Sequence, residues 1–187
     1  MDHYLDIELR PDPEFPAPQL MNALFAKLHR ALVKQGFGGI GVSFPGVDTR
    51  APHLGTRLRL HGHSEPLTTL EASDWLTGMR DHVALSRSAP TPSDARHRVV
   101  RRVQAQSNPE RLRRRLMRRH DLDAEQARQR IPDSAAQTLH LPFVQLCSTS
   151  SGQKFRLFID HGPLLDAPAP GEFSAYGLSQ TGSVPWF

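Results

Sequence analysis

Residues 4–44 read YLDIELRPDPEFPAPQLMNALFAKLHRALVKQGFGGIGVSF, and their pattern indicates the fold of the first half of the chain. Polar and apolar residues alternate over residues 4–9, which predicts a strand with one buried face. After a proline-rich turn, apolar residues recur every three or four positions over residues 20–34, which predicts an amphipathic helix. The glycines at positions 36, 38 and 39 end this helix, and residues 40–44 are predicted to form a second strand.

Three further segments continue this pattern. We expect strands at residues 57–61 and 81–85, and between them a helix at residues 67–78 that breaks near Ser73. The order strand–helix–strand–strand–helix–strand is typical of a ferredoxin-like or RRM-like unit. We place a domain boundary in the segment from Ser86 to Asp94, which contains the run SAPTPS. The predicted class is α+β, with a ferredoxin-like domain at residues 1–90 and a second α+β domain at residues 91–187.

The second half is predicted to begin with an extended segment at residues 98–106. Asn108 suits a helix cap and Pro109 the first helical position, so we expect a helix from there to His120. The remaining elements are predicted as a short helix at 121–131, strands at 141–147 and 154–159, and a closing hairpin of 173–178 with 184–187.

Arginine dominates the basic residues of the chain. Lysine and arginine together number 23, and only Lys27, Lys34 and Lys154 are lysines. Arginine binds phosphates and guanine edges with a two-point fork and stacks on bases. A GC-rich genome also favours arginine codons, so composition leaves both explanations open and position has to decide.

The predicted helix that ends at His120 carries five arginines on one stripe, at positions i, i+3, i+4, i+7 and i+8. Apolar residues on its opposite side, such as Leu116, are expected to dock the helix. Like charges at this spacing repel one another, and a face that meets only water usually mixes both signs. A polyanion is therefore the favoured partner, and the residues alone do not decide between RNA and DNA. The five are Arg111, Arg114, Arg115, Arg118 and Arg119.

Other classes of protein fit the sequence less well. No apolar run is long enough to cross a bilayer, so we expect no membrane partner. The acidic, alternating first residues do not resemble a secretion signal and a single cysteine excludes an internal disulfide framework, so the expected compartment is the cytoplasm. His61 and His63 lack partners at the spacing of a metal site, and we expect no metal or other cofactor. Cys147 is expected to be a small buried residue.

Long runs of the sequence resemble one known family. They are MDHYLDIELRPDPEFP at residues 1–16, FAKLHRAL at 25–32, RRVQAQSNPERLRRRLMRRH at 101–120, LPFVQLCSTSSGQKFRLFIDHGPL at 141–164 and YGLSQTGSVPWF at 176–187. In order and spacing they are similar to the repeat-processing endoribonucleases of CRISPR subtype I-F, the Csy-type nucleases. The resemblance is weakest between residues 46 and 95.

This resemblance implies a protein that binds the hairpin of a CRISPR repeat RNA, cuts it at the base of the stem without a cofactor, and joins other subunits of a subtype I-F targeting complex. It implies that His29 is catalytic, that Ser148 holds the attacking ribose and that Tyr176 orients the histidine. It also implies RNA-binding roles for Arg102 and Gln104 at base edges, Phe155 under the terminal base pair, Ser150 beside the cleaved strand, and Arg114, Arg115, Arg118 and Arg119 in the groove.

The implied chemistry agrees with the residue types. RNA carries its own nucleophile, the 2′-hydroxyl, so a protein can cut it by deprotonating this group and aligning it with the leaving 5′-oxygen. Histidine suits the base role because it exchanges a proton near neutral pH. The products would be a 2′,3′-cyclic phosphate and a 5′-hydroxyl. The group that protonates the leaving oxygen is left open.

His29 also has a suitable position on its predicted helix. It lies at the rim of the apolar stripe, about 100° from its centre, where a side chain packs and still faces a cleft. An ordinary boundary histidine would lie in the same place. The alternative function is therefore a non-catalytic RNA-binding protein of RRM-like build, although residues 40–44 and 57–61 lack the paired aromatics of RRM strands. Cys147 and Lys154 depart from the family pattern, which leaves the details of repeat specificity open.

Overall fold

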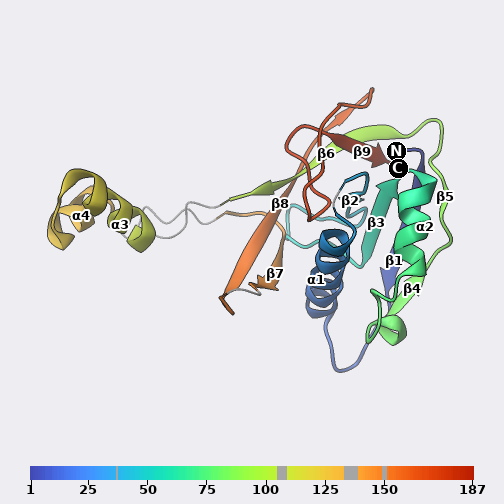
Figure 1. Ribbon diagram of the computed structural model, residues 1–187, viewed down its shortest axis with the longest axis horizontal. Helices are drawn as coiled ribbons and strands as arrows, with labels where there is room; N and C mark the ends of the chain where they lie inside the picture. The colour runs from blue at the N-terminus through green and yellow to red at the C-terminus, as the bar shows by residue number, and fades with distance from the viewer. Residues whose placement is uncertain (37, 105–108, 133–138, 149–150) are drawn as a thin grey trace. The chain divides into compact units, whose positions relative to one another are not determined.

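The computed structural model describes residues 1–36, 38–104, 109–132, 139–148 and 151–187 of the chain (Figure 1). The chain forms two compact units. The first unit comprises Met1–Val103 with Leu141–Phe187, and the second comprises Gln104–His140. Among the described residues, no helix is both long and apolar enough to span a bilayer.

The first sheet has the strand order of a ferredoxin-like unit. Two helices connect its strands: in sequence order, α1 (Ala17–Lys34) follows the first strand and α2 (Ser64–Ala72) follows the third. The antiparallel order is β2 (Gly41–Ser43), β3 (Arg57–Gly62), β1 (His3–Leu9) and β4 (Val83–Leu85), and β5 (Ala89–Pro90) pairs with the start of β1. The predicted α+β class and the order of these elements are confirmed.

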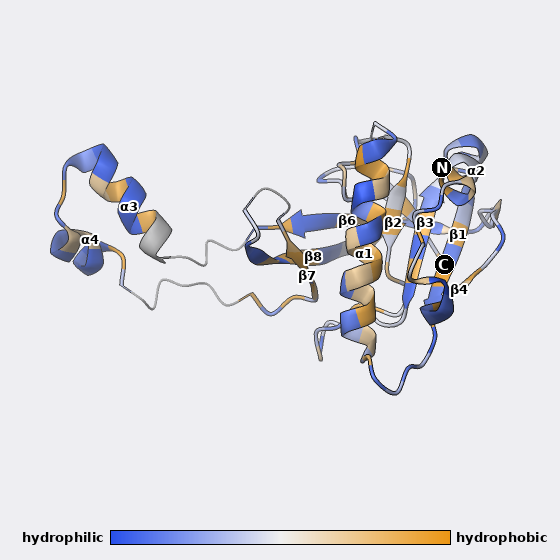
Figure 2. Ribbon diagram, turned by 60° about the horizontal axis from the view of Figure 1, so that its bottom comes forward, coloured by the Kyte–Doolittle hydropathy of each residue, from blue (hydrophilic) through white to orange (hydrophobic). Residues whose placement is uncertain are grey.

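Apolar periodicity explains why these elements form. Leu5, Ile7 and Leu9 lie on one side of β1 and are buried, as the alternation requires. The stripe of α1 is buried from Leu20 to Leu32, and Figure 2 shows it as an orange band along the helix. Helix α1 packs against β1 in the first sheet and against β7 (Phe143–Cys147) in the second.

Helix α2 ends earlier than the sequence predicts. It covers residues 64–72, because Ser73 adopts an extended conformation with φ of −85° and ψ of 147°. Turns and a short 3₁₀ helix (Arg80–His82) then lead into β4. The predicted helix at 67–78 is therefore correct only in its first half, and the break expected near Ser73 is where it stops.

The second sheet is antiparallel in the order β7–β8–β6–β9, where β8 is Lys154–Leu165, β6 is Arg96–Val103 and β9 is Ser183–Trp186. The predicted closing hairpin is wrong, because β9 pairs with β6, which is distant in the sequence. Residues 173–178 form a tight turn instead, in which Gly177 has a φ of 67° that a strand does not allow. The oxygen of Gly177 accepts a hydrogen bond from the amide of Val42 on β2 at 2.9 Å.

One hydrophobic core contains buried residues from both sheets. The described strands β1 to β5 lie before residue 91 and β6 to β9 lie after residue 95, on either side of the predicted boundary. Both sheets nevertheless belong to the first compact unit. The division at residue 90 therefore stays a prediction.

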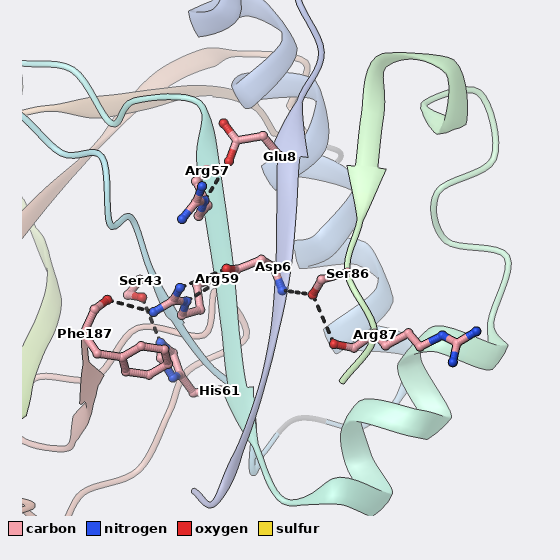
Figure 3. Close-up of polar contacts among 9 residues, drawn as sticks. All are labelled: Asp6, Glu8, Ser43, Arg57, Arg59, His61, Ser86, Arg87 and Phe187. Atoms are coloured by element: carbon pink, nitrogen blue, oxygen red, sulfur yellow. Dashed lines mark hydrogen bonds and ion pairs between the residues drawn. The ribbon is translucent and has the colours of Figure 1, made fainter. Parts of the chain in front are cut away.

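Arg59 on β3 joins the end of β9 to the first sheet (Figure 3). Its guanidinium forms a two-point ion pair with Asp6 at 2.6 and 2.9 Å and donates to the main-chain oxygen of Phe187 at 2.9 Å. The ring of Phe187 lies against the same guanidinium, 3.9 Å from its carbon to the ring centroid. Arg59 is only 6% exposed, and these bonds satisfy a charge that would otherwise be costly to bury.

The second unit contains α3 (Pro109–His120) and α4 (Ala124–Arg130), the two helices predicted there. Asp123 caps α4, and its side chain accepts from the amide of Gln126 at 2.8 Å. Arg113 of α3 is buried, and its Nε donates to the oxygen of Ile131 at 2.8 Å. Figure 2 shows both helices as mostly hydrophilic. The predicted cap Asn108 lies outside the described residues.

Candidate active site

His29 lies at the rim of the buried stripe of α1 and is half-buried, as the sequence indicates. Its Nδ1 lies 2.8 Å from the main-chain oxygen of Ala175, in the turn formed by residues 173–178. The ring of Tyr176 stacks on the imidazole, with the centroids 4.0 Å apart and 13° between the planes. Phe25, one turn earlier on α1, is parallel to Tyr176 at 6.4 Å. Neighbouring residues of one turn thus fix both the position and the rotation of the imidazole.

The bond to Ala175 determines which nitrogen of His29 carries the proton. A carbonyl oxygen only accepts hydrogen bonds, so Nδ1 has to be the donor. In the neutral imidazole the lone pair is then on Nε2. In this tautomer Nε2 is the nitrogen of His29 that can act as an acceptor.

Arg102 on β6 brings a positive charge to the same place. Its guanidinium carbon lies 5.7 Å from the centroid of the Tyr176 ring, within the range of a cation–π contact. The main-chain oxygen of Arg102 accepts a hydrogen bond from Nε2 of Gln180 at 3.0 Å. This bond ties the segment after Tyr176 to β6. The structure thus brings together three of the predicted site residues, His29, Tyr176 and Arg102.

Ser148 begins the turn between β7 and β8. Its amide donates to the oxygen of Gln153 at 2.9 Å, which closes the turn. The strand that leads to it is tied to α1, because the amide of Gln145 donates to Oδ1 of Asn22 at 2.8 Å. Asn22 and His29 are seven residues apart and so share one face of α1, two turns apart. Ser148 therefore follows directly after the strand that contacts this face of α1.

The other predicted RNA-binding residues fall on both units. Phe155 on β8 is half-buried at the edge of the core, opposite Leu146. Gln104 is exposed at the start of the second unit. Ser150 and the side chain of Arg111 lie outside the described part of the structure. The exposed arginines of α3 include the four expected in a groove, which are Arg114, Arg115, Arg118 and Arg119.

Three residues that position the candidate site or the arginine-rich helix were not predicted from the sequence. Ala175 acts through its main-chain oxygen, for which no side-chain pattern gives a signal. Asn22 had a signal, since it lies seven residues before His29 on the same helix face. Arg113 lies off the predicted stripe, and that offset indicates its role in joining α3 to the segment after α4.

The two histidines weighed as metal ligands have separate partners. His61 is buried with its Nε2 2.8 Å from Oγ of Ser43, and burial lowers its pKa to about 3, with a smaller effect from Arg59 (Figure 3). His63 is exposed, and its Nδ1 lies 3.2 Å from a carboxylate oxygen of Asp2. Among the described residues, no cluster of three or more His, Cys, Asp or Glu side chains is suited to hold a metal ion.

Cys147 is exposed, so the expectation that it is buried is wrong. It is the last residue of β7, where burial alternates strictly: Val144 and Leu146 face the core, and Gln145 and Cys147 face outward. The sequence places Cys147 beside apolar residues, but the period of the strand decides its exposure.

The chain is thus an α+β protein that has a ferredoxin-like sheet and a second compact unit with an arginine-rich helix. Sequence comparison narrows this class. Residues 4–187 match the model of a family described as CRISPR-associated protein (Cas_Csy4). The chain is 60% identical to a CRISPR-associated endonuclease Cas6/Csy4 of Pseudomonas aeruginosa (strain UCBPP-PA14) and 52% identical to one of Escherichia coli (strain UTI89 / UPEC), over the full length of all three proteins. The chain therefore belongs to the Csy4 family of CRISPR-associated proteins.

Proposed function

We propose that this protein is an endoribonuclease that binds the hairpin of a CRISPR repeat RNA and cuts the precursor transcript at the base of the stem. Both curated relatives are named CRISPR-associated endonucleases, which supports nuclease activity in this chain. In our proposal residues 1–90 supply the catalytic histidine and residues 91–187 supply most of the RNA contacts. The protein acts in the cytoplasm.

The observation that carries the mechanism is the geometry of His29. Its Nδ1 is engaged by the oxygen of Ala175, so Nε2 accepts the proton of the 2′-hydroxyl next to the scissile phosphate. Tyr176 holds the imidazole plane by stacking, and Arg102 places a positive charge near the phosphate. This arrangement supports base catalysis that requires no metal ion.

The bonds change in one displacement. The 2′-oxygen attacks the adjacent phosphorus as its proton passes to His29, and the new bond closes a 2′,3′-cyclic phosphate. The bond from phosphorus to the 5′-oxygen breaks, and the downstream strand leaves with a 5′-hydroxyl. The proton gained by His29 balances the proton that the leaving oxygen takes up. Ser148 holds the attacking ribose through its hydroxyl and forms no covalent bond.

The exposed arginines of α3 supply the affinity for the stem. Five charges of one sign on one helical stripe repel each other, and phosphates relieve that repulsion. In our proposal Arg115 and its neighbours enter the groove, Arg102 and Gln104 read base edges, and Phe155 stacks under the last base pair. Ser150 helps to place the cleaved strand. The cut RNA stays bound, and the protein joins the other subunits of a subtype I-F targeting complex.

A substrate with one altered sugar tests the reaction. RNA with a 2′-deoxy nucleotide just upstream of the cut should bind like the all-ribose hairpin and stay uncut, because it lacks the nucleophile. The all-ribose hairpin should be cut equally well with EDTA and with magnesium. Metal-assisted hydrolysis behaves differently, since water attacks and chelation stops it.

Two results would contradict this proposal. Cleavage of the deoxy substrate would show that the 2′-oxygen is not the nucleophile. A requirement for magnesium with the all-ribose substrate would show that His29 is not sufficient as the base. Tight binding without any cleavage under either condition would favour the alternative, a non-catalytic RNA-binding protein.

A further inference from the structure

A surface pocket of about 520 Å³ adjoins the turn that begins at Ser148. It lies between the start of α1, the end of β7 and the start of β8, and its volume is within the range of small-ligand sites. Its lining includes Pro16, Gln19, Asn22, Gln145, Cys147 and Lys154. None of the residues that have a part in the proposed reaction lines this pocket.

The lining side chains fit a ribonucleotide. Lys154 supplies a positive charge, and none of the described residues that line the pocket is acidic. The side-chain oxygen of Asn22 is already occupied by the amide of Gln145, so Asn22 offers its NH₂ group to a ligand that accepts hydrogen bonds. Gln19 offers a second amide, and Pro16 offers an apolar ring. Phosphate and base oxygens are acceptors that these donors bind.

The position of the pocket selects one nucleotide. Cys147 lines it and is covalently linked to Ser148, the residue proposed to hold the ribose on the 5′ side of the cut. Lys154 lines it and is followed on β8 by Phe155, proposed to stack beneath the last base pair. If Phe155 stacks beneath the last base pair, the nucleotides on the side of Phe155 away from the stem are unpaired. The unpaired nucleotide nearest Ser148 is the one joined to the held ribose through the scissile phosphate.

We propose that this pocket holds the first unpaired ribonucleotide on the 3′ side of the cut, and that Lys154 and Asn22 contact its phosphate and base. This inference rests on the proposed function. It explains how the protein distinguishes substrate from product, because the cut hairpin no longer carries this nucleotide. Uncut RNA therefore gains contacts that the retained product does not have.

The chain provides its own probe of the pocket, because Cys147 is its only cysteine and is exposed. We would measure the rate at which a maleimide labels Cys147 in the full-length protein saturated with uncleavable 2′-deoxy RNA. Three RNAs are compared: the hairpin ending at the cut, the hairpin with a 3′ flank, and the hairpin with a 5′ flank. The 3′ flank should slow labelling several-fold relative to the other two.

Each result of this experiment has a distinct meaning. Equal labelling with all three RNAs, or protection by the 5′ flank, overturns the proposal for the pocket, and equal labelling is also what a protein ligand in the pocket would give. Filter binding of the same hairpin is measured in parallel. If the hairpin does not bind, the proposed function itself fails, whereas binding without specific protection removes only the pocket.

A pair of variants tests Lys154 without labelling. K154Q should weaken binding of the 3′-flanked deoxy RNA about 3- to 10-fold, the size expected for the net contribution of one hydrogen bond, and leave binding of the cut hairpin unchanged. K34Q is the matched control, because Lys34 is exposed at the end of α1 and does not line the pocket. Equal weakening of both RNAs by K154Q would show a general electrostatic effect and overturn the assignment.

Discussion

The imidazole of His29 has two neighbours that act on different properties of the ring. The oxygen of Ala175 fixes its tautomer, and the ring of Tyr176 fixes its plane. Replacing His29 with alanine should lower the cleavage rate roughly 10²- to 10⁴-fold, the usual contribution of a general base, and leave hairpin binding nearly intact. Single-turnover cleavage and filter binding of the same RNA measure the two effects. A large loss of affinity would instead show that His29 has a structural role.

The contributions of the ring and of the hydroxyl of Tyr176 to cleavage can be measured separately with two substitutions. Tyr176→Phe keeps the stacked ring and should cut nearly as fast as the unmodified protein. Tyr176→Leu removes the stack at 4.0 Å and should slow cleavage well beyond the phenylalanine variant, with binding preserved. Equal loss in both variants would show that the hydroxyl, and not the ring, is what the reaction needs.

Single residues were predictable from the sequence only where periodicity or resemblance indicated them. The helical period placed His29 at the rim of the buried stripe, and it is half-buried there. The period of β7 would have shown Cys147 to be exposed, and the apolar neighbours were misleading. The contact with Ala175 depends on a main-chain atom 146 residues away, and local sequence carries no signal for such a contact.

At the level of elements, α3 carries exposed arginines, which we propose bind RNA, and one buried arginine that bonds to the main chain. Arg115 is exposed on the predicted stripe, whereas Arg113 is buried and bonded to the oxygen of Ile131. Arg115→Ala should weaken hairpin binding by ~1–3 kcal/mol if it contacts a guanine edge, and the loss should depend on the base opposite it. Arg130→Ala, on exposed α4, is the matched control and should have little effect.

The dependence on base identity is the decisive part of this measurement. Gel-shift titrations with the natural stem and with stems of altered base pairs give the two affinities. If Arg115→Ala weakens all stems equally, α3 contacts phosphate alone and contributes no sequence recognition. If Arg130→Ala weakens binding as much as Arg115→Ala, the stripe is not the binding face.

Elements with strong local periodicity were predicted well, and those defined by distant pairing were not. The helix α1 and the strands β1 and β3 each carry their own apolar pattern, and they lie within a few residues of the prediction. The predicted closing hairpin was wrong because β9 does not pair with the nearby residues 173–178. It pairs with β6, which is distant in the sequence. Pairing between remote segments depends on the complete core, which a short window of sequence does not contain.

The whole molecule has a core that encloses two histidines. His161 on β8 contacts the rings of Phe44 and Trp186, with centroids at 6.0 and 5.6 Å, and within the described structure neither ring nitrogen has a hydrogen-bond partner. Its pKa is lowered to about 4, mainly by burial and also by the charge of Arg98, while Asp160 acts in the opposite direction. The pKa of His61 is lowered to about 3. Both side chains are therefore neutral in the folded protein at neutral pH.

These two groups make the fold sensitive to acid. Between pH 6.5, the ordinary value, and pH 4 the unfolded chain binds protons that the folded protein does not, so the free energy of unfolding falls as the pH decreases through this window. Each histidine contributes at most ~1.4 kcal/mol per pH unit. His161→Phe keeps an aromatic ring between Phe44 and Trp186 and should flatten this slope by up to that amount between pH 6.5 and 5. Urea unfolding across this range measures it. Ile159→Val, buried on the same strand, should lower stability equally at every pH, and an unchanged slope in His161→Phe would show that His161 is already charged or solvated in the folded protein.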